Sequence, residues 1–273
     1  MREPRPEQAG EAARASAPVG TPGPPRPPSP VGPAAVSIAA GLAFAGLTGY
    51  VAAKGTAVPW VDEHIHRWVI ADRSGGSAAI ARAVTWGGVT TVALPVLIGV
   101  GAAAAGAGRD LSRRLWSGVV LACVAGAGVY VSTRIGWAVG RARPPVADWA
   151  GAAGGPSFPS IHTTVATLFA ASCAWAIAAR VRPGWPRRGT WAAAAGYAAT
   201  VGWSRIWLGV HWPSDVVGGW LFGLTWSAGS IAVILILRRQ SDDRGAAGLA
   251  AGSPAAPQDD SLVVGTDSAD SGS

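Results

Sequence analysis

The chain has 273 residues, of which 49% are hydrophobic and only 14% are charged, and it carries a formal net charge of +7. This composition favours a membrane protein with several spans, because one bilayer crossing needs about 20 mostly apolar residues and the chain holds several such runs. The positive charge comes from arginines scattered between the apolar runs, whereas a nucleic-acid-binding protein gathers its cations on one soluble face. We therefore exclude a nucleic-acid partner and expect the chain to sit in a lipid bilayer.

Six apolar stretches predict an all-α fold, a bundle of six transmembrane helices that forms one membrane domain at residues 33–240. The predicted helices cover residues 34–53, 78–105, 115–139, 161–180, 190–208 and 214–237. The flanking segments, residues 1–32 and 241–273, are rich in small residues or proline and too poor in large apolar residues to bury a core. We predict that both are disordered tails.

Arginine clusters indicate how the predicted helices are oriented. They follow the second, fourth and sixth helices and consist of Arg109, Arg113 and Arg114, then Arg180, Arg182, Arg187 and Arg188, then Arg238, Arg239 and Arg244. The positive-inside rule places these loops and both termini in the cytoplasm. The sequence thus predicts a multi-pass cell-membrane protein whose opposite loops, including residues 140–160, are extracytoplasmic.

Three polar stretches lie at the predicted outer ends of the third to sixth helices: GRARPP at 140–145, FPSIHTT at 158–164 and SRIWLGVHWPSD at 204–215. Each alone has a structural explanation, because arginines snorkel to lipid head groups and serines cap helices. Together they indicate a phosphate site, since the guanidinium groups of Arg143 and Arg205 match phosphate oxygens. Ser160 stands where an N-cap is expected, and the free amides that follow an N-cap attract the same anion.

Two histidines supply reactive groups to this predicted site. His211 and Asp215 are four residues apart, so the carboxylate can hold one ring nitrogen while the other stays free to attack phosphorus. His162, at the start of the fourth predicted helix, can donate a proton to the leaving oxygen. The sequence therefore predicts a nucleophile, an acid and an anion clamp in one outward-facing site.

These motifs resemble, in the same order, the three-part signature of the type 2 phosphatidic acid phosphatase family, membrane lipid phosphatases related to the vanadium haloperoxidases. The matching residues are RARP at 141–144, PSIH at 159–162 and the pattern SR-x5-H-x3-D at 204–215, and the resemblance covers roughly residues 34–237. It implies a six-helix membrane fold and metal-independent hydrolysis of a phosphate monoester or diphosphate on a lipid, through a phosphohistidine intermediate and without a cofactor.

The resemblance also implies a role for each matching residue. Arg143, Ser160 and Arg205 would hold the phosphate, His162 would be the acid, His211 the nucleophile and Asp215 its orienting partner. The implied partners are a membrane lipid phosphate and the bilayer that contains it.

The chain departs from the family's pattern at two positions. Gly136 stands where the first motif usually has Lys, so we consider Arg134 and Arg141 as substitutes, although Arg134 would point about 200° away on a regular helix. Ile161 stands where the family has Gly; its backbone amide can still bind phosphate, but its branched side chain narrows the pocket. We expect an altered substrate range, slower turnover, or both.

Other polar and small residues are given structural explanations. The segment VDEHIHRW at 61–68 is interpreted as a solvated interfacial helix, because its His and carboxylate spacing is weak evidence for a metal, and we predict no metal site. Gly218, Gly219 and Gly223 are interpreted as positions where helices pack closely.

The sequence leaves the substrate and the acceptor open. Candidate substrates are polyprenyl diphosphates such as undecaprenyl diphosphate, slightly preferred, together with phosphatidic acid and phosphatidylglycerol phosphate. A lipid phosphotransferase with the same histidine chemistry is one alternative function, and a catalytically weakened lipid-binding membrane protein is another. The transferase is separated from a hydrolase by its products when alcohols are added.

Overall fold

The computed structural model describes residues 28–106 and 108–252, and every regular element in these two ranges is helical. The all-α prediction is therefore confirmed for the described part of the chain. The elements are α2 (Val31–Lys54), α3 (Trp60–Asp72), α4 (Gly75–Thr85), η1 (Trp86–Gly88), α5 (Thr90–Ala104), α6 (Leu111–Val139), η2 (Val146–Asp148), α7 (Ile161–Ala178), α8 (Trp185–Trp207) and α9 (Pro213–Gly252).

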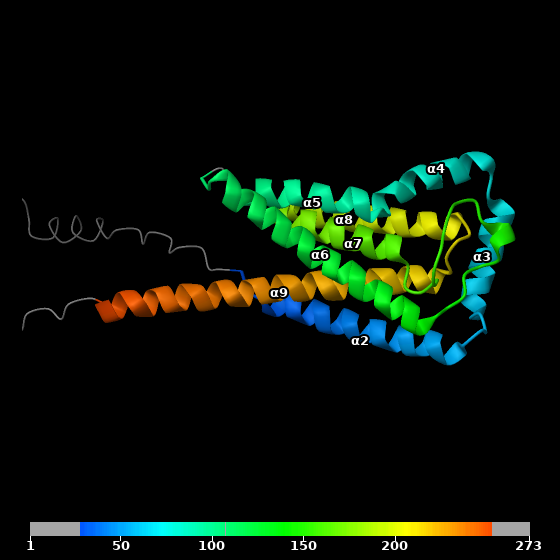
Figure 1. Cartoon of the computed structure of the whole chain (residues 1–273), viewed down its shortest axis with the longest axis horizontal. Helices are drawn as coiled ribbons and strands as arrows, with labels where there is room; N and C mark the ends of the chain where they lie inside the picture. Colours follow the sequence, from blue (N-terminus) through cyan, green and yellow to red (C-terminus); the bar gives the residue numbers. More distant parts are fainter. Residues whose placement is uncertain (1–27, 107, 253–273) are drawn as a thin grey trace, which may run out of the picture.

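The long helices run side by side in an elongated bundle, and α3 lies across one end of it (Figure 1). Helix α2 packs along α9, α5 packs along α6, and α7 packs against α5, α6, α8 and α9. As a result α7 is the most enclosed of the apolar helices, with 61% of its candidate span buried. This central helix also begins with one of the three polar motifs.

Four helices are long and apolar enough to cross a membrane: α2, α6, α7 and the part of α9 at Pro213–Gly245. The predicted second span is instead a bent pair, Gly75–Gly88 and Thr90–Ala104, which passes the same test as one unit with a 50° bend. Helix α8 does not pass it, because its 23 residues are mostly Ala, Gly, Trp and polar residues and are less apolar than those of the other long helices. The described residues thus hold four candidate spans, or five with the bent pair, and the sixth stays a prediction.

The last helix is longer than its sequence predicted. We expected it to end at residue 237 and a disordered tail to begin at 241, yet α9 continues to Gly252. Residues 238–252 include four Ala and three Arg, which favour helix, and contain no Pro that would end it. At the other end, α2 begins at Val31, inside the tail predicted for residues 1–32. Residues 1–27 and 253–273 of the two predicted tails lie outside the described residues.

Small residues allow α7 and α9 to pack closely beside the polar motifs. A methyl group on Gly219 would lie 2.8 Å from the carbonyl oxygen of Ser160, and one on Gly223 would lie 2.6 Å from Cβ of Thr167. Gly218 lies in the same way against the ring of Phe158. The interpretation of these three glycines as packing positions is confirmed.

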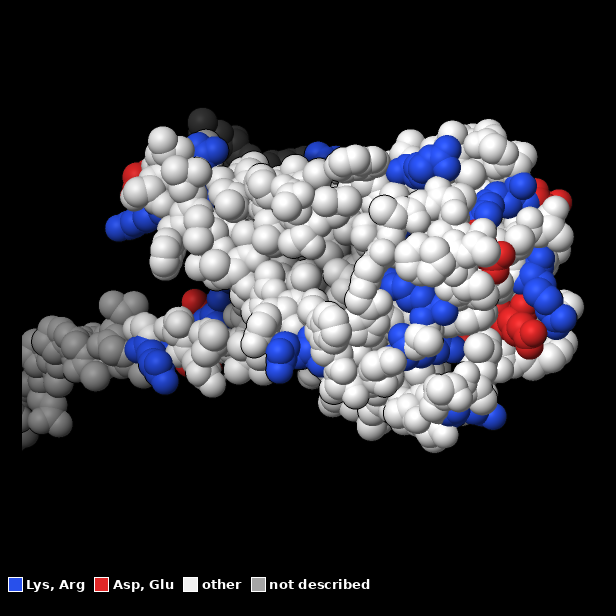
Figure 2. All heavy atoms as spheres, turned by 45° about the vertical axis from the view of Figure 1, so that its right-hand side comes forward, with Lys and Arg blue, Asp and Glu red and all other residues white. Residues whose placement is uncertain are grey.

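Charged residues gather toward the two ends of the bundle on the face shown in Figure 2, and the band between them is largely without charge. A chain that crosses a bilayer needs such a band, because charged side chains at membrane depth are costly. The end capped by α3 is one of the two charged ends, and the motifs lie there.

Candidate active site

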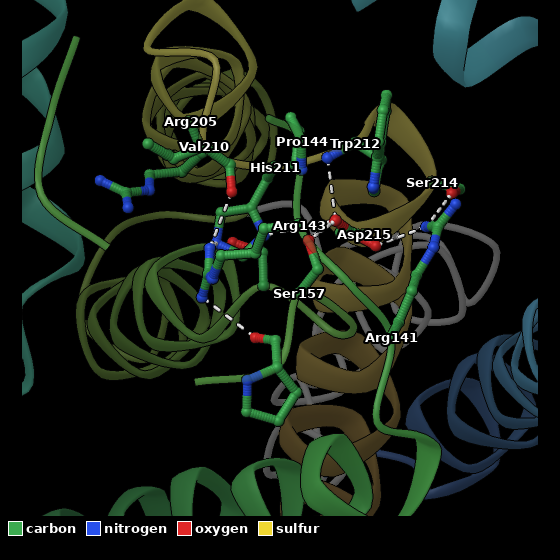
Figure 3. A network of polar contacts seen from close by, with 12 residues as sticks. Arg141, Arg143, Pro144, Ser157, Arg205, Val210, His211, Trp212, Ser214 and Asp215 are labelled. Carbon is green, nitrogen blue, oxygen red and sulfur yellow. Dashed lines mark hydrogen bonds and ion pairs between the residues drawn. The ribbon is translucent and has the colours of Figure 1, made fainter. Parts of the chain in front are cut away.

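The three polar motifs meet at the end of the bundle that α3 covers (Figures 1 and 3). Helices α7 and α9 begin at this end, and α6 and α8 finish there. The loop after α6 contributes Arg141 and Arg143, and the short connection between α8 and α9 contributes His211. Segments far apart in the sequence are thus brought together because the connections on this side of the bundle carry the polar residues.

The side chain of His211 lies between a carboxylate and a guanidinium group (Figure 3). Its Nε2 is 2.8 Å from Nη1 of Arg143, and its Nδ1 is 3.4 Å from Oδ2 of Asp215. A guanidinium group can only donate hydrogen bonds, so Nε2 must accept with its lone pair. The ring proton then belongs on Nδ1, facing the carboxylate, and Nε2 is left as the basic, nucleophilic nitrogen.

The environment of His211 keeps its ring neutral at ordinary pH. The imidazole is only 1% exposed, and burial lowers the pKa of His211 to about 4, with a further lowering from the charges of Arg143 and Arg205. The nearby Asp215 opposes this by favouring the protonated ring. Burial dominates, so the nucleophilic form is present at neutral pH.

The carboxylate of Asp215 is fixed from several sides and is fully buried. Oδ2 accepts hydrogen bonds from the hydroxyl of Ser157 and from the amide of Trp212, the latter at 2.8 Å. Oδ1 accepts one from Nη1 of Arg141 at 2.5 Å. With Asp215 near the N-terminus of α9, the positive end of the helix dipole also favours its charge.

Arg143 is held almost entirely by backbone carbonyls. Its guanidinium group donates to the carbonyl oxygens of Gly154, Gly155, Pro156 and Val210 at distances of 2.8 to 3.0 Å. Burial lowers the pKa of Arg143, and the charge of Asp215 acts against this. The loop at residues 154–156 therefore positions a cation directly beside His211.

Arg205 is the second cation near the histidine, and it is 2% exposed. Nη1 donates to Oγ1 of Thr85 at 2.8 Å, while the buried Nε has no hydrogen-bond partner among the described residues. A buried donor without an acceptor is costly, and an anion beside it would remove that cost. Arg205 therefore has the character of an anion-binding residue.

The start of α7 supplies further donors. Ser160 is the N-cap, as predicted, but its side chain makes no capping bond; Oγ accepts from Oγ1 of Thr163 instead. The amides of Ile161, His162 and Thr163 have no acceptor in the part of the chain that the structure describes. These amides form a helix N-terminus that is open to a phosphate. The amide of Ser160 is used differently, donating to the carbonyl oxygen of Asp215 at 3.0 Å.

His162, the predicted acid, follows directly in the first turn of α7 and is partly buried. It lies close enough to Arg205, His211 and Arg143 for their charges to act on its ring. The bent pair helps to place it, because Gly88 packs against the backbone of His162 so closely that a Cβ there would lie 2.7 Å from its carbonyl oxygen. Both histidines of the motifs thus lie in one cluster with the two arginines.

The expectation that Arg141 or Arg134 binds phosphate needs correction. The guanidinium group of Arg141 is buried and paired with Asp62 and Asp215, so its charge is already engaged. Arg134 is exposed on α6, while Gly136 two residues later is buried against the carbonyl of Phe158. A regular helix separates these two positions by about 200°, so Arg134 does not replace the missing lysine.

Several residues that organise this site were not predicted from the sequence, above all Asp62, Ser157 and Ser214. The interpretation of residues 61–68 as solvated is wrong for Asp62 and His66, which are 2% and 4% exposed. Their signal was the spacing of Asp62, His66 and Val69, which places them on one buried face of α3. No cluster of three potential metal ligands occurs in the described residues.

Comparisons with known proteins agree with the geometry. The family model of the PAP2 superfamily matches residues 116–239, a range that holds all three motifs. The family resemblance predicted from the sequence is thus confirmed. The Escherichia coli (strain K12) protein named "Putative undecaprenyl-diphosphatase YbjG" is 38% identical over 68 residues, or 25% of this chain and 30% of that protein's length.

A solved structure shares the fold. The first transmembrane PAP2-type phosphatidylglycerolphosphate phosphatase from Bacillus subtilis superposes with a TM-score of 0.60 and 23% sequence identity, covering 76% of this chain and 96% of that one. The arrangement of helices is thus that of a known transmembrane protein.

Proposed function

We propose that this chain, whose residues 116–239 match the PAP2 superfamily, hydrolyses a phosphate monoester or diphosphate on a membrane lipid through a phosphohistidine intermediate. The observation that carries the proposal is the state of His211. Its Nε2 accepts from Arg143 and its Nδ1 faces Asp215, which is the arrangement that an imidazole nucleophile needs.

In the first step, Nε2 of His211 attacks the terminal phosphorus, and the bond from that phosphorus to the oxygen of the leaving group breaks. The leaving group is the lipid alcohol for a monoester and the lipid monophosphate for a diphosphate. His162 donates a proton to that leaving oxygen. The cations of Arg143 and Arg205 and the open amides of α7 balance the charge on the phosphoryl oxygens. Asp215 stabilises the positive charge that develops on the ring of His211.

In the second step, water attacks the phosphorus of the phosphohistidine, and His162 accepts a proton from this water. The bond from phosphorus to Nε2 breaks, which releases inorganic phosphate and restores the neutral ring. Both steps use only side chains and amides of this chain and water.

The position of the site suits a substrate held in the bilayer. The cluster lies at the charged end of a bundle that has four or five candidate spans, so a lipid can present its phosphate there while its tail stays in the membrane. We place this end on the extracytoplasmic side and both termini in the cytoplasm, with α8 as the further span of a six-helix topology.

Among lipid phosphates we favour a polyprenyl diphosphate such as undecaprenyl diphosphate. The name of the Escherichia coli relative supports this choice, and the name of the Bacillus subtilis structure supports phosphatidylglycerol phosphate as the runner-up. Both substrates end in a phosphate carried by a lipid.

The deciding experiment is phosphate release by the purified full chain from undecaprenyl diphosphate, phosphatidylglycerol phosphate and phosphatidic acid, in the presence of a chelator. Wild type should release phosphate, and His211→Ala should lose at least about 1,000-fold in kcat. Arg67→Lys, on the exposed side of α3, serves as the control. Unchanged release by His211→Ala contradicts the mechanism, and phosphoryl transfer to added alcohol in place of release identifies a transferase.

A further inference from the structure

An ion-pair network connects the crossing helix α3 to the carboxylate beside His211. Arg141 lies between two carboxylates, with Nη2 2.7 Å from Oδ2 of Asp62 and Nη1 2.5 Å from Oδ1 of Asp215. All three side chains are at least nine-tenths buried. Asp62 comes from α3, outside the three motifs, and it is linked to the histidine through Arg141 and Asp215.

Asp62 also holds the first turn of α9. Oδ1 accepts from the amide of Ser214 at 2.8 Å, and Oδ2 interacts with the hydroxyl of Ser214 at 2.5 Å. The amide of Ser214 is one of the donors that a helix start leaves without an internal acceptor. Asp62 thus caps α9 from another helix, at the residue directly before Asp215.

The charges in this network decide how much of the negative charge of Asp215 acts on the ring of His211. Arg141 alone would neutralise the carboxylate of Asp215 and weaken its hold on the ring. With Asp62 as a second anion, the three groups carry a net charge of −1, and Arg141 is shared between two carboxylates. The charge facing Nδ1 of His211 is therefore retained.

We propose that Asp62 is a positioning residue for the reaction: through Arg141 and Ser214 it fixes the place and charge of Asp215, and so the tautomer and aim of His211. The inference rests on the proposed function, because it assumes that His211 is the nucleophile. It assigns a role to a residue that lies outside the motifs and outside residues 116–239.

Anchoring of α3 does not depend on Asp62 alone. His66 pairs with Asp148 at 3.0 Å, Arg73 donates to the carbonyl of Trp207 at 3.3 Å, and Val69 is fully buried in an apolar cluster with Ile206 and Val216. These contacts keep the helix in place when Asp62 changes. They also provide a control on the same buried face, since His66 makes no hydrogen bond to Asp62, Arg141, Ser214 or Asp215 and its ring only packs on that of Trp212, with the centroids 5.1 Å apart.

The test compares Asp62→Asn with His66→Gln in the full chain, using two inhibitors. Orthovanadate takes five-coordinate geometry by bonding to a nucleophile and so mimics the transition state, whereas inorganic phosphate only occupies the anion clamp. In Asp62→Asn we expect kcat to fall at least about 30-fold with KM within about threefold. Vanadate inhibition should weaken at least about 10-fold and phosphate inhibition less than about threefold.

The controls separate positioning from mere stability. His66→Gln should keep the wild-type ratio of vanadate to phosphate inhibition even if its melting temperature falls as far as that of Asp62→Asn. Asp62→Glu, which keeps the charge, should recover most of the vanadate affinity. If Asp62→Asn does not fold, Ser214→Ala replaces it and must shift the inhibitor ratio in the same direction by at least about threefold.

Several results overturn the inference: an unchanged inhibitor ratio in Asp62→Asn, an equal loss of both inhibitors, or the same shift in His66→Gln. His211→Ala is measured alongside these variants. If it retains turnover, the proposed function fails, whereas loss of turnover in His211→Ala with a normal Asp62→Asn refutes only the positioning role.

Discussion

At the scale of single residues, the site is defined by what each side chain can donate or accept. His211 accepts a hydrogen bond from Arg143, which has no acceptor of its own, so the protonation of the ring follows from its neighbours. In Arg205, Nη1 donates to Thr85 and Nη2 donates to the carbonyl of Ala152 at 3.5 Å, while the buried Nε has no partner among the described residues. These two features lead to separate predictions.

The first concerns pH. Because the pKa of His211 is lowered to about 4, the unprotonated nucleophile should persist as the pH falls from 7 and should be lost only near pH 4. The acid limb of kcat/KM, which reports the free enzyme, is expected near that value. The measurement is kcat/KM from pH 3.5 to 8, corrected for the separately measured titration of the substrate's phosphate. An acid limb at the ordinary histidine value of about 6.5 would contradict the burial argument.

The second concerns the fork of Arg205. Arg205→Lys keeps the positive charge, but the ammonium group of lysine has a single nitrogen. It cannot donate to Thr85 with one nitrogen and to a phosphate oxygen with another. We expect KM and the inhibition constant of inorganic phosphate to rise at least about 10-fold. Arg67→Lys is the control for the chemical change itself. Equal phosphate affinity in the two variants would show that Arg205 only supports Thr85.

At the scale of elements, the glycines of α9 set how closely the nucleophile and the anion clamp approach. In Gly219→Ala the new Cβ would lie 2.8 Å from both the carbonyl of Ser160 and Cβ of Thr163, so α7 and α9 must separate. We expect a loss of about 1 to 3 kcal/mol in stability and a fall in kcat. Thermal unfolding measures the first quantity, and the rate of phosphate release measures the second. Gly46→Ala in α2, which has open space around it, should leave kcat unchanged and should not lower stability, because Ala favours helix over Gly.

Sequence pattern predicted the helices well where apolar length alone decides. Residues 161–180 and 115–139 correspond closely to α7 and α6. The pattern could not show the bend after Gly88, because an apolar run does not reveal that a glycine meets His162 of another helix. It also missed the end of α9, where polar residues continue the helix.

The motif residues of the candidate site could be predicted from the sequence, but the residues that hold them in place could not. Residues such as Arg143, His162 and His211 stood out because polar groups are rare beside apolar runs, and the structure brings them together. The partners of Arg141 could not be predicted, since Asp62 lies in another helix and only the fold decides which carboxylates share one guanidinium group. Arg141 was predicted to bind phosphate, but its pairing with the two carboxylates makes it a structural residue.

At the scale of the whole molecule, the arginine distribution predicts which end of the bundle faces the cytoplasm. Single cysteines can test this in a background of Cys123→Ala and Cys173→Ala. Val146→Cys, in the exposed loop near the site, should react with a membrane-impermeant maleimide in intact cells, and Pro183→Cys, between α7 and α8, should react only after lysis. The opposite pattern would place the site in the cytosol and exclude an extracytoplasmic phosphatase.

One contact between the starts of α7 and α9 involves no side chain. The link from Ser160 to Asp215 runs from a main-chain amide to a main-chain carbonyl, so ordinary replacement of either side chain leaves it in place. The starts of α7 and α9 are therefore joined by a main-chain contact in addition to the side-chain contacts of Asp215. Side chains around the phosphate site can therefore be replaced, in a redesign for new esters, while this main-chain contact continues to join the two helices.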